Sequence, residues 1–362
     1  MELKKSKYTP EELNAILGYF AIVKREYTYS SLTAGYINDT FLVSSFNQPL
    51  YILQRINTEV FKDVSGLMQN ITTALEALQG SDYSSLKYIH TLSGGAYAET
   101  ELGFWRLVNY IPNSITYTTT NDTDIAFEAG RVIGKFHLLL QKESISGYVD
   151  TVPKFHNLEF RKEQFTTALA SAKNDRIKIA ENALITAQNI LAKLNTFNLK
   201  DLPIRICHND TKLNNILFSQ TSKKALCLID LDTIMKGYFL YDFGDAVRTI
   251  VNAASEDEKD HGKITFDTEL FNAIAKGLAS NTAFLTKNEI KSLPIGVFMM
   301  PFLHGLRALT DYLNGNIYYK VTYENQNLDR CLSLFDFTVK AQKQIPFMEE
   351  VLSDVFTNDK LF

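Results

Sequence analysis

Residues 206–245 contain Ile-Cys-His-Asn-Asp-Thr-Lys-Leu-Asn-Asn-Ile-Leu-Phe, then Leu-Ile-Asp-Leu-Asp-Thr, then Leu-Tyr-Asp-Phe-Gly-Asp. His208, Asp210 and Asn215 form an H-x-D-x-x-x-x-N pattern, and Asp230 follows at the end of a short apolar run. Phosphoryl transfer needs a base near the acceptor hydroxyl and oxygen ligands for a metal ion that holds the phosphates. Because the stretch supplies both in this order, it indicates a phosphotransferase.

The residues of this stretch divide into reacting and supporting groups. Asp210 is the expected catalytic base, which orients the acceptor hydroxyl and takes its proton, so it also contacts the substrate. Asn215 and Asp230 offer the hard oxygen ligands that Mg²⁺ prefers while it shares the phosphates of ATP. Supporting roles are expected for His208, Lys212 and Asp232.

The supporting residues each leave an alternative open. His208 is expected to brace the loop by hydrogen bonds rather than to react. Lys212 could contact the γ-phosphate or face solvent, and Asp232 could be a second metal ligand or, as we favour, a structural acid. Asp242 and Asp245 are candidates for internal ion-pair partners that hold the loop.

Two other classes of protein compete with this interpretation. A metal-dependent hydrolase usually needs more histidine and aspartate ligands, whereas this chain has six histidines, none at H-E-x-x-H spacing. A catalytically inactive nucleotide-binding module is disfavoured because Asp210, Asn215 and Asp230 are all present.

Length and composition predict a folded, two-lobed protein. The chain has 362 residues, too many for one small core, and we expect a nucleotide-binding lobe at 1–112 and a catalytic and substrate-binding lobe at 113–362. A net charge of −4 without a long basic run argues against nucleic acid as a partner. Three cysteines without C-x-x-C spacing suit reduced, buried thiols.

No membrane association is expected from the sequence. The N-terminus lacks the apolar core of a secretory signal, and the longest apolar stretch, residues 295–303, is too short to span a bilayer. We therefore expect a cytoplasmic protein, a monomer or weak dimer, whose partners are small molecules.

The first lobe is expected to be rich in β-strands. A capping box at Thr9 starts a short helix, residues 33–43 suggest a strand, a turn and a strand, and residues 49–57 suggest a further strand. A helix is expected at 64–78, a hairpin around Gly94–Gly95, and a strand at 104–111 that contains a core tryptophan, Trp105.

Six residues of this lobe are candidates for contacts with the nucleotide. The turn could present backbone N–H groups to an anion, although it has one glycine and could equally be a plain hairpin. Arg55 stands where the third strand of a kinase places a phosphate-binding lysine, or it is a surface arginine. The candidates for its partner are polar but not clearly acidic: Gln69 and Asn70, with Glu59 and Asp63 upstream. The candidates are Gly35, Asn38, Thr40, Arg55, Asn109 and Ile111.

The second lobe is expected to be helical and to bind the acceptor. A helix is expected at 125–140, in which His137 is more often a satisfied core residue than a ligand. Residues 304–320 combine Arg, Asp and several aromatic residues, a composition suited to a sugar, or else form an amphipathic helix with an aromatic-rich turn. Arg307 and Tyr318 are the candidate substrate contacts.

At these residues the chain resembles the aminoglycoside phosphotransferase superfamily, whose fold is α+β, two-lobed and protein-kinase-like, with a small β-rich N-lobe and a larger helical C-lobe. The segments His-Asn-Asp-Thr-Lys-Leu-Asn-Asn-Ile-Leu-Phe, Leu-Tyr-Asp-Phe-Gly-Asp-Ala-Val-Arg and Asp-Tyr-Leu-Asn-Gly-Asn-Ile-Tyr-Tyr-Lys look like the N-acetylhexosamine 1-kinases. The segments Tyr-Ile-Leu-Gln-Arg-Ile-Asn and Val-Pro-Lys-Phe-His are also similar to that group, so the resemblance spans nearly the whole chain.

This resemblance implies ATP-dependent phosphorylation of the anomeric hydroxyl of GlcNAc or GalNAc. It implies that Asp210 is the base, that Asn215 and Asp230 hold Mg²⁺, and that the strand cation is Arg55, an arginine where the family has lysine. Arg307 is the best match for a sugar contact. Kinases of the same superfamily also act on choline, homoserine, methylthioribose or aminoglycosides, and these acceptors remain alternatives.

Overall fold

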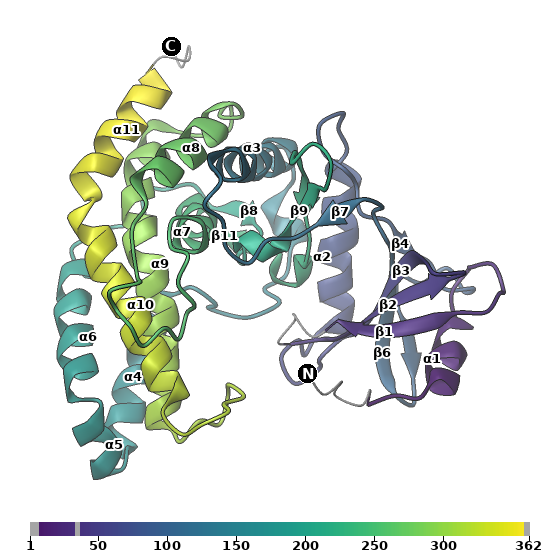
Figure 1. Ribbon diagram of the computed structural model, residues 1–362, viewed down its shortest axis with the longest axis horizontal. Coiled ribbons are helices and arrows are strands. Elements are labelled where there is room, and N and C mark those ends of the chain that lie inside the picture. The colour runs from purple at the N-terminus through teal and green to yellow at the C-terminus, as the bar shows by residue number, and fades with distance from the viewer. Residues whose placement is uncertain (1–6, 33–36, 358–362) are drawn as a thin grey trace.

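The computed structural model describes residues 7–32 and 37–357, which form a small antiparallel sheet and a larger, mostly helical part (Figure 1). The strands are β1 (Thr28–Leu32), β2 (Asp39–Ser45), β3 (Gln48–Arg55), β4 (Tyr88–Ile89), β5 (Ala98–Thr100), β6 (Gly103–Asn109), β7 (Ser114–Ile115), β8 (Arg205–Cys207), β9 (Ile216–Ser219), β10 (Ala225–Leu228) and β11 (Met235–Gly237). The α-helices are α1 (Pro10–Leu17), α2 (Val64–Ala77), α3 (Thr123–Leu140), α4 (Leu158–Ser171), α5 (Asn174–Ile179), α6 (Glu181–Leu194), α7 (Phe239–Ile250), α8 (Thr268–Ala279), α9 (Lys287–Leu313), α10 (Gln326–Lys343) and α11 (Ile345–Thr357). Three short 3₁₀ turns are η1 (Ile145–Gly147), η2 (Leu213–Asn215) and η3 (Leu231–Thr233). The expected α+β, kinase-like architecture is confirmed.

The small sheet has the strand order β1-β2-β3-β6-β4, and β5 also pairs with β6. Alternation along the strands gives it two apolar faces. One face packs against α1, where Leu53 and Trp105 are fully buried with Leu13, and Figure 1 shows α1 on the outer side of the sheet. The other face carries Ile52 and Val108 into a core that it shares with α2 and the larger part. The sheet is therefore attached to the helical part through this second face.

Two local predictions for the small lobe have different outcomes. The capping box is present, since the Thr9 hydroxyl accepts from Glu12 N and the Glu12 carboxylate accepts from Thr9 N. The hairpin expected around Gly94–Gly95 is wrong. A local turn forms there, in which Thr91 N donates to Gly95 O, but β4 and β5 both pair with β6 rather than with each other. The long strand β6 offers both of them a free edge, so pairing with it replaces the expected hairpin.

The larger part supports the candidate catalytic residues on two short sheets. These sheets have the orders β10-β9-β7 and β11-β8, and α3 and α7 pack beside them. The chain leaves the first sheet at the end of β6 and enters the second at β7, which pairs with β9. This change of sheet occurs close to Pro112, and the division into lobes at 1–112 and 113–362 stays a prediction.

Helix α9 is the central helix of the larger part. By length and composition it could cross a membrane, but 83% of its most apolar window is buried inside the protein. Core helices of folded proteins have the same properties. It begins at a second capping box, formed by Thr286 and Glu289. It crosses α7 at a close approach of two glycines, because a Cβ on Gly244 would lie 2.2 Å from the Gly296 carbonyl oxygen.

We expect Gly244→Ala to reduce the free energy of unfolding by about 2 kcal/mol, because the added methyl would force α7 and α9 apart. The measurement is urea denaturation followed by circular dichroism. Gly147→Ala is the matched control, since a Cβ on Gly147 has no atom within 4 Å. Equal denaturation midpoints for the two variants would contradict the close helix crossing.

Candidate active site

The loop between β8 and β9, residues 208–215, brings three predicted residues together around one carboxylate. We name it the catalytic loop after the predicted role of Asp210. Asp210 Oδ2 lies 2.9 Å from Lys212 Nζ and accepts from Asn215 Nδ2 at 2.9 Å. Asn215 Nδ2 also donates to the Asp210 carbonyl at 2.8 Å. No residue in the described part of the chain donates to Asp210 Oδ1, so this oxygen is the one available to an acceptor hydroxyl. Burial alone would lower the pKa of Lys212, but the charges of Asp210 and Asp230 outweigh it and raise that pKa.

His208 connects this loop to the loop that carries Asp230. Its Nε2 lies 2.8 Å from the Ile229 carbonyl oxygen, and its Nδ1 lies 3.3 Å from Asp210 N. A carbonyl can only accept and a backbone amide can only donate, so the proton belongs on Nε2 and Nδ1 is an acceptor. Both ring nitrogens are therefore engaged within the protein, an arrangement that suits a bracing role.

Asp230 and Asn215 present oxygens suited to a hard divalent cation. The Asn215 amide nitrogen is used by Asp210, which leaves its carbonyl oxygen as the atom that can bind a cation. Asp230 adopts a left-handed backbone conformation, with φ of 61°, and its side chain remains open to solvent. The surrounding protein still removes part of the water that would solvate the carboxylate. This desolvation and the adjacent charge of Asp232 raise the pKa of Asp230 to about 6. A cation bound there would stabilise the ionised carboxylate, so these residues fit Mg²⁺.

Asp232 links the loop between β10 and β11, which carries Asp230, to the small sheet. Its Oδ2 accepts from Asn38 Nδ2 at 2.6 Å, and its Oδ1 lies 2.5 Å from Arg106 Nη1. Arg106 Nε in turn donates to Gln54 Oε1 at 3.0 Å, and Gln54 Nε2 donates to Thr40 Oγ1 at 3.2 Å. The structure thus brings Asn38 and Thr40, both predicted from the sequence, into one hydrogen-bonded network with Asp232.

Sequence reasoning missed Arg106 and Gln54. Arg106 is fully buried within β6, in the middle of an otherwise apolar run. A buried cation is costly unless it is paired, so its position inside that run was the signal that could have identified it.

Arg55 lies on the opposite face of the sheet from Gln54. Its guanidinium lies 3.7 Å from Asp39 Oδ2, and its Nε donates to the Leu102 carbonyl at 2.8 Å. Asp39 is thus its acidic partner, instead of Glu59, Asp63, Gln69 or Asn70. Asp63 caps α2, and Asn70 donates to carbonyls of the larger part. The structure therefore does not bring Arg55 to the catalytic loop.

Two of the remaining nucleotide candidates, Asn109 and Ile111, lie at the end of β6 and just after it. Asn109 Oδ1 accepts from Lys87 N at 2.6 Å, and this bond fixes the segment that enters β4. The Ile111 carbonyl accepts from Ser114 Oγ at 2.6 Å, so it shapes the connection into β7. Gly35 lies outside the described residues. Roles for these three residues in binding adenine or phosphate stay predictions.

Comparison with known proteins agrees with this arrangement. A model of the phosphotransferase enzyme family (APH) matches residues 28–268, about two thirds of the chain. The chain belongs to this family. Family membership makes it a small-molecule kinase that phosphorylates hydroxyl groups.

Solved structures similar to this phosphotransferase share its fold. A microcompartment-associated aminopropanol kinase is 16% identical with a TM-score of 0.63, and the alignment covers 93% of this chain and 98% of that one. An aminoglycoside phosphotransferase from Alicyclobacillus acidocaldarius is 14% identical with a TM-score of 0.60, covering 97% and 98%. A choline/ethanolamine kinase family protein from Mesorhizobium loti is 14% identical with a TM-score of 0.59, covering 96% and 99%. At these identities the likeness shows the fold alone.

Arg307 of this phosphotransferase lies among aromatic rings that connect to the catalytic loop. Its guanidinium carbon is 5.0 Å from the centre of the Phe155 ring and 6.0 Å from that of Tyr319. The next residue, His156, places its Nε2 2.9 Å from the Asn209 carbonyl oxygen, so the Phe155–His156 pair joins Arg307 to the loop. Sequence reasoning had singled out Arg307 but not these two partners.

The turn after α9 is held by one buried carboxylate. Asp311 accepts from the backbone amides of Tyr318 at 2.8 Å and Tyr319 at 2.9 Å, and it also accepts from Asn327 Nδ2 at 2.8 Å. Tyr318 itself is 58% exposed, and its ring packs edge-on against that of Tyr319. Tyr318 is therefore available to a ligand, but its contact with substrate stays a prediction.

This aromatic region carries several positive charges. Burial and the nearby charge of Arg307 lower the pKa of Arg161 to about 10. The Arg330 guanidinium lies 4.7 Å from the centre of the Tyr319 ring and pairs with Glu256 at 2.5 Å. Glu256 offsets the charge of Arg330, whereas Arg161 and Arg307 form no ion pair within the described residues, so the excess positive charge lies on these two side chains.

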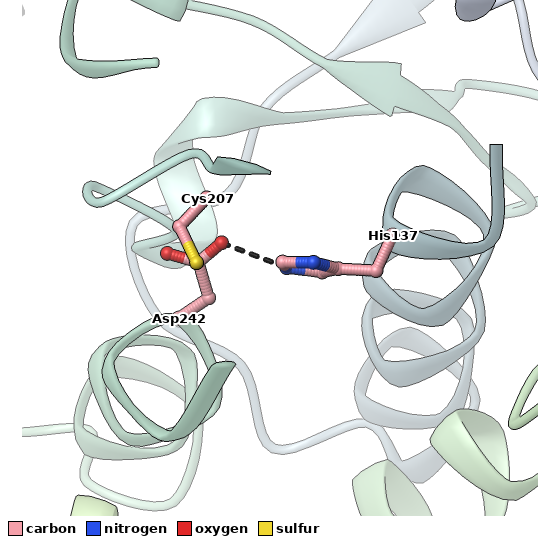
Figure 2. Close-up of side chains that lie close together, drawn as sticks. All are labelled: His137, Cys207 and Asp242. Atoms are coloured by element: carbon pink, nitrogen blue, oxygen red, sulfur yellow. Dashed lines mark hydrogen bonds and ion pairs between the residues drawn. The ribbon is translucent and has the colours of Figure 1, made fainter. Parts of the chain in front are cut away.

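A buried carboxylate on α7 clamps the catalytic loop from behind. Asp242 Oδ2 accepts from His208 N at 2.8 Å and from His137 Nε2 at 2.9 Å, and its Oδ1 accepts from Asn209 N at 2.7 Å. Figure 2 shows the His137 ring directed from α3 toward this carboxylate, with Cys207 close to it. Ligand atoms of the three side chains lie within 4.8 Å of one another, a spacing that could hold a metal ion. Because N–H donors already occupy both carboxylate oxygens, we interpret the cluster as a structural clamp, in which His137 is the satisfied core residue expected from the sequence.

We expect Asp242→Asn to reduce the free energy of unfolding by about 3 kcal/mol, since it removes a buried charge that accepts three hydrogen bonds. Cys207→Ala is the matched variant, expected to cost about 1 kcal/mol because it removes packing only. The measurements are urea denaturation and elemental analysis of the purified protein. Equal losses in both variants, together with stoichiometric bound metal, would show a metal centre instead of a clamp.

Proposed function

We propose that the protein transfers the γ-phosphate of ATP to the anomeric hydroxyl of an N-acetylhexosamine, GlcNAc or GalNAc, and so makes the sugar 1-phosphate. The observation that supports the phosphotransfer step is the set of hydrogen bonds made by the Asp210 carboxylate. Its Oδ2 is held by Lys212 and Asn215, while Oδ1 has no donor within the described residues. A carboxylate fixed through one oxygen leaves the other oriented toward a hydroxyl that is to lose its proton.

Each group of the loop has a defined part in this reaction. Asp210 positions the acceptor hydroxyl and takes its proton as the bond to phosphorus forms. Lys212 is a cation beside that carboxylate and is able to contact the transferred phosphoryl group. Asn215 and Asp230 would hold Mg²⁺, which neutralises charge on the phosphates when it is bound. His208 keeps the Asp210 loop and the Asp230 loop in register through its two ring nitrogens.

ATP as the donor is supported by the fold and by the network around Asp232. Related structures include a spectinomycin phosphotransferase in complex with ADP and an amicoumacin kinase in complex with AMP-PNP. Their chains are 12% and 13% identical to this one, so they support the class of donor and not individual contacts. In this chain Asn38, just before β2, bonds to Asp232, and Thr40 of β2 belongs to the same network, which supports a nucleotide site at this edge of the small sheet.

An uncharged sugar is the acceptor best supported by the region around Arg307. Arg161 and Arg307, which form no ion pair within the described residues, disfavour a quaternary amine or an aminoglycoside, because those acceptors are cations. Aromatic rings and guanidinium groups together suit a neutral pyranose, since rings stack on its face and N–H groups bind its oxygens. The resemblance to N-acetylhexosamine 1-kinases supports the same choice.

Kinases of other hydroxyl acceptors, such as choline, homoserine, methylthioribose or an aminoglycoside, are the alternative within the family. A cytoplasmic location, a monomeric or weakly dimeric state, and partners limited to ATP and a small sugar stay predictions.

With Mg²⁺ and ATP, the purified protein should release ADP fastest with GlcNAc or GalNAc in a panel that also contains choline, homoserine, methylthioribose and kanamycin. The measurement is a coupled ADP assay, with the product identified as the 1-phosphate by phosphorus NMR.

Asp210→Asn should lower kcat by about a thousandfold while ATP binding persists, because only the base is lost. A higher rate with choline or kanamycin would refute the sugar proposal, and an unchanged rate in Asp210→Asn would refute the base.

Arg307→Gln should raise the KM for the best sugar by about tenfold or more and leave the KM for ATP unchanged. The reason is that the side chain is assigned to the acceptor and not to the nucleotide. Steady-state kinetics with each substrate varied in turn separates the two effects. If the KM for ATP rose instead, Arg307 would belong to the nucleotide site.

A further inference from the structure

We propose that Arg106, on β6, is the cation that the small sheet contributes to the phosphates of the bound nucleotide, in place of Arg55. The inference rests on the proposed function, because it assumes that ATP binds between the small sheet and the catalytic loop. It concerns one side chain, and its test uses nucleotide binding rather than turnover.

Both terminal nitrogens of Arg106 are buried without a hydrogen-bond partner among the described residues, and only Nη1 has an ion-pair partner. Its Nε donates to Gln54 at 3.0 Å, and its Nη1 lies 2.5 Å from Asp232 Oδ1. Its Nη2 has no hydrogen-bond partner among the described residues, although the side chain is 0% exposed. A buried guanidinium N–H without an acceptor is costly, and a phosphate oxygen is the acceptor for which guanidinium geometry is best suited.

Arg106 faces the residues that would surround the phosphates. Its partner Asp232 is two residues from Asp230, and the charges of both aspartates act on it, so its pKa is raised despite the opposing effect of burial. Lys212 pairs with Asp210 at 2.9 Å, and His208 joins Asp210 to the Ile229 carbonyl beside Asp230. Five charged groups therefore lie around one small volume: Asp210, Lys212, Asp230, Asp232 and Arg106. Three carboxylates and two cations leave this volume negative, and a tetra-anionic nucleotide needs both cations as well as its metal ion.

The register of the sheet explains why this cation comes from β6. Gln54 of β3 lies opposite Arg106, whereas Arg55 lies opposite Trp105. Trp105 is buried in the α1-side cluster, so Arg55 shares the face of the sheet that points away from the catalytic loop. The position on β3 that faces the loop is occupied by a neutral glutamine. The positive charge on this face is therefore supplied by the neighbouring strand.

A structural role for Arg106 is the competing explanation, in which it only neutralises the buried Asp232. Arg106→Gln alone does not separate the two, because it also removes the counter-ion of the buried Asp232. Asp232→Asn likewise leaves the Arg106 charge unpaired, so the comparison below requires that its thermal melt shows a folded protein. Removing both charges avoids this problem. Asp232→Asn alone isolates any contribution of Asp232 to binding, so the comparison of Arg106→Gln/Asp232→Asn with Asp232→Asn measures Arg106.

The experiment is calorimetric titration of the full chain with Mg-ATP and with AMP. Relative to Asp232→Asn, the double variant should bind Mg-ATP at least tenfold more weakly and AMP within twofold, because AMP lacks the β- and γ-phosphates. Arg55→Gln, the matched arginine-to-glutamine change on the other face, should bind Mg-ATP within twofold of the unsubstituted protein. Thermal melts by circular dichroism confirm that each variant is folded.

Three results would overturn the assignment of Arg106. These are equal Mg-ATP affinities for Asp232→Asn and the double variant, equal losses for Mg-ATP and AMP, or a tenfold loss in Arg55→Gln alone. If the unsubstituted protein failed to bind Mg-ATP, the proposed function would itself be wrong. The two failures are therefore distinguishable.

Discussion

The catalytic loop depends on one buried carboxylate. Asp242 accepts from two successive backbone amides, those of His208 and Asn209, and from the ring of His137. Two bonded amides fix the direction in which the chain leaves β8, and hence where Asp210 points one residue later. Backbone amides cannot shift as freely as side chains, so the clamp gives the loop a rigidity that hydrogen bonds between side chains alone would not provide.

Asp232 holds the small sheet against the larger part of the molecule, as Asp242 holds the catalytic loop. Where Asp242 binds groups within the larger part, Asp232 binds Arg106 and Asn38 of the small sheet. Any displacement of the sheet relative to the catalytic loop would separate these charges in a buried environment, which is unfavourable. The position of the sheet and the position of the adjacent Asp230 are therefore linked through one side chain.

Sequence reasoning predicted the fold and the catalytic loop better than the small sheet. Asp210, Lys212 and Asn215 lie within six residues of chain, so local geometry brings them together whatever the tertiary structure. The expected position of Arg55 beside the phosphates could not be derived in this way. Alternation along a strand defines two faces but does not say which of them faces the catalytic loop. That choice depends on where α1 and α2 pack. The sequence shows Arg106 as a cation within an apolar run, but that it lies beside Gln54 follows only from the register of β3 and β6.

The distribution of charge gives the two proposed substrates different surroundings. Asp210, Asp230 and Asp232 lie on the side proposed for the nucleotide, where a polyphosphate would need a metal ion and the nearby cations to offset their negative charge. The side around Arg307 has the opposite sign, because Arg161 and Arg307 have no carboxylate partner within the described residues. A cationic acceptor would be attracted by the first set of charges and repelled by the second, and it would compete with the metal ion for the carboxylates. A neutral sugar avoids this conflict, because its hydroxyls can accept from arginine on one side and donate to Asp210 on the other.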